Sequence, residues 1–196
     1  LGVDWIALTP GASYRGFHDS LVNHLGNERP EMLLCLHEEH AVSIAHGFAK
    51  VTGQAMAVAL HSNVGLMHGS MGIFNAWGDR APMLVLGATG PVDATRRRPW
   101  IDWLHTAQDQ GALIRHFTKW DDQPGSTEAV PESMARGWKI TNTSPKAPVY
   151  INMDAGCQEA PLDAEITWPD LARHAPLAPP APNAALIEKA AKALAN

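Results

Sequence analysis

The sequence predicts an α/β fold: an open, doubly wound, mostly parallel six-stranded sheet with helices on both faces. Short apolar segments alternate with segments of helical periodicity, and the connections between them are too long for β-hairpins. The apolar segments are continuous rather than alternating with polar residues, which indicates strands covered on both faces. The predicted strands cover residues 4–8, 31–37, 54–61, 82–86, 117–120 and 147–153.

The helices are predicted from apolar residues that recur at helical spacing. The segment that follows Glu38 has this spacing and ends at Gly53, a residue type that commonly closes helices. Residues 62–65 are expected to form a turn, and 87–103 a loop. Pro131 is expected to interrupt its helix near the first turns. The predicted helices cover about 14–25, 38–53, 66–77, 106–115 and 127–141.

Composition limits the partners and the setting. A formal net charge of −5 provides no basic surface for nucleic acid. No apolar run approaches the roughly 18 residues that a membrane span needs, so no membrane partner is expected. Two cysteines are too few for a disulfide framework, and Cys35 lies in an apolar run. We therefore expect a reducing, cytoplasmic compartment.

The domain organisation is predicted from a change in composition towards the end of the chain. Residues 1–155 are expected to form one domain, 156–182 a Pro- and Ala-rich linker, and 183–196 the first helix of a truncated following domain. Leu1 is not an initiator Met, and the last helix has no downstream partner for its apolar face. The chain is accordingly expected to be a piece of a longer protein.

A ligand site is expected beyond the carboxyl ends of the strands, where open parallel sheets bind their ligands. Loops 10–13, 37–39, 61–65 and 87–91 fall there. Glu38 follows an apolar strand and precedes small residues, so we predict that it is an acid/base group for a bound heterocyclic cofactor. A carboxyl in apolar surroundings tends to keep its proton. The alternative is a carboxylate that only caps a helix.

Histidines supply the other candidates. His61 ends a buried strand at the same edge and is a catalytic candidate, with a hydrogen-bonded structural histidine as the alternative. His105 follows the loop and is a weaker candidate. His68 and the remaining histidines are assigned to the surface or to packing.

Motif patterns in the sequence argue against two classes of site, a metal site and a diphosphate site. In the segment His37-Glu38-Glu39-His40 the histidines are three residues apart rather than four, and no third ligand pattern accompanies them. We therefore predict no metal site. Neither a GxGxxG fingerprint nor a Walker loop occurs, so the domain is not expected to bind a diphosphate by itself.

Two adjacent blocks resemble a known family. The segment HEEHAVSIAHGFAKVTG and the following HSNVGLMHGSMGIFNAWGDRAPMLVLGATGP are similar to the pyrimidine-binding, N-terminal domain of thiamine diphosphate enzymes of the benzoylformate decarboxylase and acetolactate synthase type. TPGAS upstream and FTKW downstream resemble further elements of that domain. The resemblance covers about residues 4–153.

The resemblance implies roles for individual residues. Glu38 matches the glutamate that hydrogen-bonds N1′ of the cofactor's aminopyrimidine and promotes the ylide. His61 matches a histidine that transfers protons on the substrate in the benzoylformate-decarboxylase-like branch. His105-Thr106 faintly resembles a His-Thr element of pyruvate-decarboxylase-like members, which makes His105 a further catalytic candidate. Ala12 stands where that first branch has a substrate-binding serine, with Ser13 beside it. The implied cofactor-binding residues are Glu38, Pro10, Gly11, Ser62, Gly65 and Asn75.

The resemblance also implies the cofactors and partners. Thiamine diphosphate would be bound together with Mg²⁺, the metal held by a domain absent from this chain. The implied substrate is a small 2-oxo acid, and the implied assembly is a homodimer or homotetramer with a shared active site. The predicted function is the cofactor-activating domain of a decarboxylase or carboligase, inactive as a fragment alone. An acetolactate-synthase-like condensing enzyme, a non-catalytic binding or assembly module, and a small His/Glu hydrolase are the alternatives.

Overall fold

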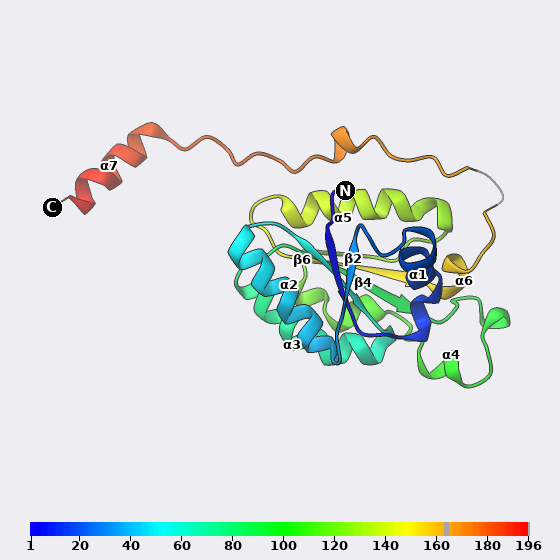
Figure 1. Cartoon of the computed structure of the whole chain (residues 1–196). Coiled ribbons are helices and arrows are strands. Elements are labelled where there is room, and N and C mark those ends of the chain that lie inside the picture. Colours follow the sequence, from blue (N-terminus) through cyan, green and yellow to red (C-terminus); the bar gives the residue numbers. More distant parts are fainter. Residues whose placement is uncertain (163–164, 196) are drawn as a thin grey trace.

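One six-stranded sheet forms the centre of the part of the chain that the computed structural model describes, residues 1–162 and 165–195. Its strands are all parallel and lie in the order β2-β1-β3-β4-β6-β5 (Figure 1). The predicted fold class is confirmed. The strands are β1 Trp5–Leu8, β2 Glu31–Leu34, β3 Met56–Leu60, β4 Met83–Thr89, β5 Trp120–Asp122 and β6 Pro148–Asp154.

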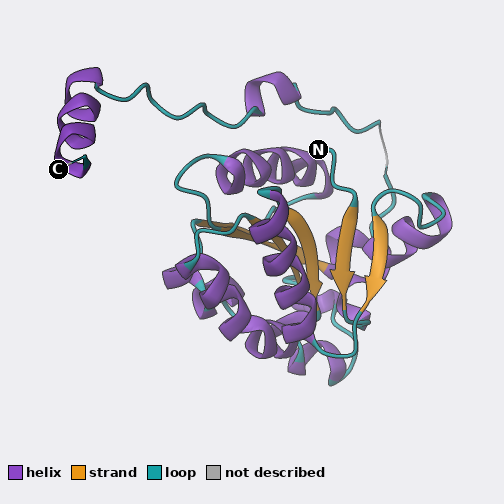
Figure 2. Ribbon diagram, turned by 60° about the vertical axis from the view of Figure 1, so that its left-hand side comes forward, coloured by secondary structure: helices purple, strands orange, loops and turns teal. Residues whose placement is uncertain are grey.

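Helices cover both faces of the sheet (Figure 2). Neighbouring residues of a strand point to opposite faces, so Ala7 packs in the core beneath α2 and α3, whereas Ile6 packs with α1 and α5. The α-helices are α1 Arg15–Asp19, α2 Glu38–Thr52, α3 Ser62–Gly78, α4 Ile101–Leu104, α5 Val130–Asn142, α6 Ala155–Gln158 and α7 Ala184–Leu194. A π-helical turn, η2 Ser20–His24, extends α1, and the 3₁₀ turns are η1 Ala12–Tyr14, η3 Ala94–Arg96, η4 Gln110–Leu113, η5 Arg115–Phe117, η6 Thr127–Ala129 and η7 Leu171–His174.

Helices α2 and α3 pack closely because α3 carries glycines on the side that faces α2. A Cβ atom added at Gly72 would lie 2.9 Å from Cγ1 of Val42, and one added at Gly69 would lie 3.2 Å from Cγ2 of the same side chain. Both helices begin just beyond the carboxyl ends of their strands. Close packing therefore brings the first turns of α2 and α3 together at that edge.

The strand order reverses beside β1. The chain passes from β1 to β2 on one side and then returns to β3 on the other. The connections after β1 and β3 consequently diverge, which opens a crevice at the carboxyl ends of these two strands. The loop 9–13 and the residue His61 lie there.

Several predicted elements differ from the structure. Residues 62–65, predicted as a turn, form the first turn of α3. The predicted loop 87–103 contains η3 and the start of α4. Pro131 lies in the first turn of α5, where a proline is tolerated, and does not interrupt it.

The predicted helix over 106–115 is wrong, and a buried amide explains the difference. Gln110 is fully buried, and its Nε2 donates to Ala88 O at 3.1 Å, Tyr150 Oη at 2.8 Å and Asn152 Oδ1 at 3.2 Å. These bonds attach the segment to β4 and β6. The backbone follows this attachment in short 3₁₀ turns instead of a continuous helix.

The chain beyond α6 first runs along α5, where Lys139 Nζ donates to Arg173 O and Leu177 N donates to Thr143 Oγ1, and only then leaves the sheet domain. Beyond α6 the described residues contain only η7 and α7, and no residue of α7 is buried. Figure 1 shows α7 apart from the sheet. The division at 155 and 182 stays a prediction. Within the described ranges, every helix is too short or too polar to cross a membrane.

The contact between Gly87 and Tyr150 predicts a stability effect. A Cβ atom at Gly87 on β4 would overlap the hydroxyl of the fully buried Tyr150. We expect Gly87→Ala to lower the free energy of unfolding by about 1–3 kcal/mol, as overpacking does in dense cores. Urea denaturation would measure the change.

The matched control is Gly47→Ala on the exposed side of α2, where an added Cβ meets nothing within 4 Å. Because alanine favours a helix over glycine by about 1 kcal/mol, this variant should be as stable as the parent protein or more stable. Equal destabilisation by both substitutions would contradict the role given to Gly87.

Candidate active site

Glu38 is held at the start of α2 by a helix cap. The preceding residue, His37, has extended backbone angles, and its Nδ1 accepts a hydrogen bond from the backbone N–H of Glu39 at 3.1 Å. The helix ends at Gly53, whose φ of 72° is the left-handed conformation that glycine adopts readily. Glu38 is 8% exposed, so its carboxylate lies inside the molecule instead of in open solvent.

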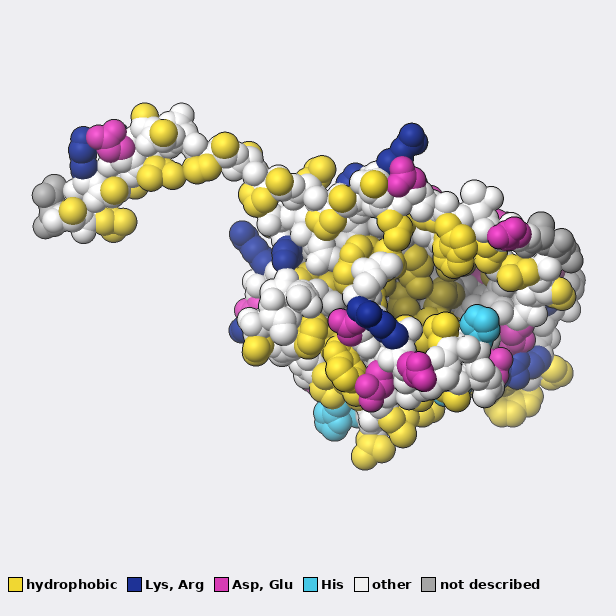
Figure 3. Space-filling model, turned by 45° about the horizontal axis from the view of Figure 1, so that its top comes forward, with side chains coloured by type: hydrophobic (Ala, Val, Ile, Leu, Met, Phe, Trp, Pro, Cys, Tyr) yellow, Lys and Arg dark blue, Asp and Glu magenta, His cyan; other side chains and the backbone are white. Residues whose placement is uncertain are grey.

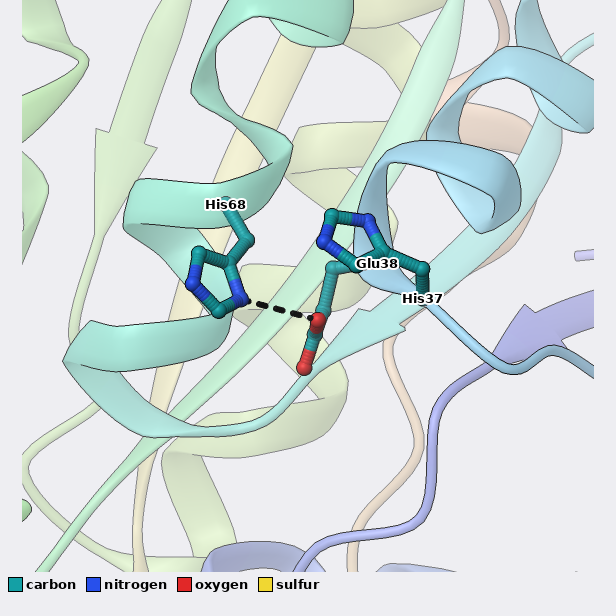
Figure 4. A group of neighbouring side chains, drawn as sticks. All are labelled: His37, Glu38 and His68. Atoms are coloured by element: carbon teal, nitrogen blue, oxygen red, sulfur yellow. Dashed lines mark hydrogen bonds and ion pairs between the residues drawn. The ribbon is translucent and has the colours of Figure 1, made fainter.

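Both oxygens of the Glu38 carboxylate face α3. Oε2 lies 3.3 Å from Nδ1 of His68, as Figure 4 shows. Oε1 lies beside Gly65, where an added Cβ would come within 3.1 Å of it. Gly65 therefore leaves the space that the Glu38 carboxylate occupies. The structure brings these two predicted site residues together.

His61 lies at the neighbouring strand end, immediately before α3. Its Nδ1 is 3.0 Å from Oγ of Ser13, and its ring centroid is 4.8 Å from that of His105. A Cβ at Gly11 would overlap the His61 ring, so the loop after β1 packs directly on it. Burial lowers the pKa of His61 below its usual value and His105 lowers it further, while Glu38 acts in the opposite direction.

Tyr14 completes the buried part of the site and was not predicted from the sequence. Its ring meets that of His61 edge-on, with 6.3 Å between centroids. The hydroxyl is buried and has no hydrogen-bond partner among the described residues. Burial raises the pKa of the Tyr14 phenol above its usual range, and the charge of Glu38 raises it further. Glu38 thus acts electrostatically on both rings.

Ser62 links His61 to His105 through the backbone. Ser62 is fully buried and has a φ of 54°, which is rare for a residue with a side chain. Its hydroxyl donates to the backbone oxygen of His105 at 2.8 Å. The predicted residues Glu38, His61, Ser62, Gly65, His105, Gly11 and Pro10 therefore lie on adjoining connections at one edge of the sheet.

Asn75 lies apart from the others. It is exposed near the end of α3, thirteen residues after Ser62, which is about 20 Å along a helix. Within one chain the structure does not bring it to Glu38. Its predicted role in cofactor binding stays a prediction.

A large apolar hollow lies away from this site. It has a volume of about 530 Å³ and lies between α1 and α5, on the other face of the sheet from α2 and α3. Phe17, Met134 and Trp168 are among the residues that line it. Figure 3 shows the surface hollowed over hydrophobic side chains on that side. Since it has no acid/base pair comparable to Glu38 and His61 among its lining residues, the sheet edge is the better candidate.

Known proteins similar to this chain include a decarboxylase and an acetolactate synthase. A benzoylformate decarboxylase from Pseudomonas aeruginosa is 28% identical over 135 residues, which are 68% of this chain and 25% of the relative. The acetolactate synthase large subunit of Lactococcus lactis is 28% identical over 154 residues, 78% of this chain and 25% of the relative. The chain thus spans about a quarter of the length of these relatives.

Solved structures agree with the fold. A Rhodococcus jostii thiamine diphosphate-dependent 4-hydroxybenzoylformate decarboxylase superposes with a TM-score of 0.74 at 22% identity, over 98% of this chain and 34% of that one. Benzoylformate decarboxylase from Polynucleobacter necessarius superposes with a TM-score of 0.72 at 19% identity, over 86% of this chain and 30% of that one. The family model for the thiamine pyrophosphate enzyme N-terminal TPP binding domain matches residues 1–115. The chain therefore belongs to the thiamine pyrophosphate enzymes, through their N-terminal TPP-binding domain.

Proposed function

We propose that this chain is the cofactor-activating domain of a thiamine diphosphate-dependent 2-oxo acid decarboxylase or carboligase. The observation that carries the proposal is the buried carboxylate of Glu38 at the carboxyl edge of the sheet, beside the turn that follows His61. A carboxyl group excluded from solvent can hold a proton against a ring nitrogen without competition from water.

The residues present suit the pyrimidine end of the cofactor. Glu38 offers a hydrogen-bonding partner for a ring nitrogen, and the Tyr14 hydroxyl nearby lacks a partner among the described residues. The sequence has neither a GxGxxG fingerprint nor a Walker loop. We therefore propose that another domain, not included in this chain, holds the diphosphate and Mg²⁺. When bound, thiamine diphosphate supplies an electron sink for cleavage next to a carbonyl.

The site residues of this chain have separate proposed roles. Glu38 holds the proton at N1′ of the aminopyrimidine. His61 accepts or returns a proton at the substrate, a role supported by its lowered pKa, which keeps the imidazole neutral near pH 7. The hydrogen bond between Ser13 and Nδ1 of His61 fixes the ring, so that Nε2 remains for the substrate. His105 lies beside this ring and is a further candidate for proton transfer.

His61 favours a decarboxylase or carboligase over an acetolactate-synthase-like condensing enzyme, which is the second candidate. The two curated relatives described above represent both branches at equal identity. A small 2-oxo acid is the proposed substrate in either case. The two free cysteines, Cys35 and Cys157, are consistent with a reducing, cytoplasmic setting.

An apolar stripe on α3 supports a homodimer or homotetramer with a shared site. Side chains at helical spacing along α3 are exposed although they are large and hydrophobic. The stripe begins beside Gly65, in the turn that packs against Glu38, and Asn75 lies next to its far end. A second copy of the chain would bury this face next to the site. The stripe consists of Val64, Met67, Met71, Phe74 and Trp77.

The first prediction concerns Glu38. In the full-length enzyme, Glu38→Gln should lower kcat for 2-oxo acid turnover by about 100-fold or more, because an amide cannot exchange the proton at N1′. Steady-state kinetics with pyruvate and with aryl 2-oxo acids would measure this loss. Glu39→Gln is the matched control, since the adjacent Glu39 is exposed. An unchanged kcat in Glu38→Gln would contradict the proposed mechanism.

A second prediction concerns the pKa of His61. Because His105 lowers it, His105→Gln should raise the pKa of His61 towards the ordinary value for histidine. His61 would then protonate at higher pH, and the acidic limb of the activity profile should move the same way. NMR titration of the ring protons would measure the shift. His24→Gln, at an exposed position of the chain, should leave the titration unchanged. A fall in the His61 pKa would contradict the prediction.

A third prediction concerns assembly. Met71→Glu in the full-length protein should weaken self-association by about tenfold or more, because the interface would bury an unpaired charge. Sedimentation velocity over a range of concentrations would measure the association constant. Val51→Glu on α2 alters a side chain that is also exposed but lies outside the stripe. The same weakening in both variants would contradict an interface on α3.

A further inference from the structure

We propose that His37, Glu38 and His68 form a binding site for a zinc-class divalent cation. One potential ligand atom from each residue lies within 4.8 Å of the other two. Figure 4 shows the two imidazoles and the carboxylate converging from α2 and α3. The motif His37-Glu38-Glu39-His40 lacks a third ligand in sequence, and the fold supplies one from the opposite helix.

The spacing of the ligand atoms suits tetrahedral coordination. Ligand atoms at about 2.0–2.1 Å from a tetrahedral zinc ion lie about 3.3–3.4 Å apart. Nδ1 of His68 and Oε2 of Glu38 are 3.3 Å apart, so these two atoms need no rearrangement to share a cation. The His37 and His68 rings are stacked, with centroids 5.1 Å apart and 20° between their planes. An imidazole nitrogen binds a cation in the plane of its ring, so the His37 ring must turn out of this stack for its free nitrogen to reach the same ion.

The helix packing holds the ligands in place before any cation binds. His37 and Glu38 are adjacent at the start of α2, and His68 is on the second turn of α3. The contacts of Gly69 and Gly72 with Val42 fix the distance between these helices. The ligand residues thus project from two packed elements and not from a mobile loop.

The donor set is that of open zinc sites. Two imidazoles and one carboxylate also hold zinc in enzymes that keep a fourth position for water or another ligand. Nδ1 of His37 accepts the N–H of Glu39, so Nε2 is the nitrogen left for the cation. Coordination through Nε2 places the ring proton on Nδ1, which can then no longer accept the hydrogen bond from the N–H of Glu39. Binding therefore exchanges a hydrogen bond for a metal bond and is weaker than at a closed structural site.

The cation and the cofactor would compete. This consequence rests on the proposed function, in which Glu38 contacts the aminopyrimidine. A carboxylate whose Oε2 coordinates zinc and whose Oε1 lies beside Gly65 has no free side for a ring nitrogen. A zinc-class cation should accordingly exclude the pyrimidine from this site.

Zinc titration of the cofactor-free protein against a chromophoric chelator tests the site itself. We expect one Zn²⁺ per chain with micromolar affinity, weakened at least tenfold by His68→Asn. His40→Gln is the matched control, because His40 is exposed on the same turn as Glu38 but lies outside the ligand set. Binding lost equally in His40→Gln, lost in Cys157→Ser, or absent from the parent protein would overturn the proposal.

A second titration separates this inference from the proposed function. The full-length enzyme is loaded with thiamine diphosphate and Mg²⁺, freed of unbound cofactor, and titrated with Zn²⁺. We expect the zinc affinity of the site that His68→Asn weakens to be at least tenfold lower in the loaded enzyme than in the cofactor-free protein. Unchanged zinc affinity in the loaded enzyme would refute competition at Glu38 while leaving the zinc site standing. Loss of zinc binding in the first titration, with normal cofactor binding, would refute the zinc site alone.

Discussion

The contact between the Glu38 carboxylate and the first turns of α3 is the interaction on which the site depends. Gly65 has no side chain, so one carboxylate oxygen reaches the helix, while the other meets His68. The same turn continues from His61, whose ring is packed by the loop after β1. A larger residue at 65 would occupy the space of the Glu38 carboxylate and push it away from this turn. The proposed chemistry thus rests on one close approach between two helices.

The central strands could be predicted from sequence because each is a continuous apolar run. Their ends are less well predicted, since β4 continues to Thr89 beyond the predicted end at 86. The edge strands also differ: β2 ends at Leu34 instead of 37, and β5 covers Trp120–Asp122 instead of 117–120. The region between β4 and β5 could not be predicted in the same way. Its path follows the buried Gln110, whose partners are backbone and side-chain atoms distant in sequence. Periodicity within a short window contains no information about such partners.

The candidate site was predictable where its residues end strands or begin helices. Glu38 and His61 follow apolar runs, and the topology brings them to one edge. His68 and Tyr14 were not identified, because their contacts arise from helix packing and from the folding of the loop after β1. One signal was available for His68: it lies beside Gly69 on the glycine-bearing side of α3 that faces α2.

Ser62 ties the start of α3 to the segment between β4 and β5. It occupies the junction between β3 and α3 in a left-handed conformation, and its hydroxyl is bonded to the backbone of His105. The long excursion between β4 and β5 is therefore anchored to the hinge that aims the His61 ring. The excursion also carries His105, whose ring lies beside that imidazole. Burial lowers the pKa of the imidazole and His105 lowers it further, so the path of a segment far from Glu38 in sequence helps to set the acidity of His61.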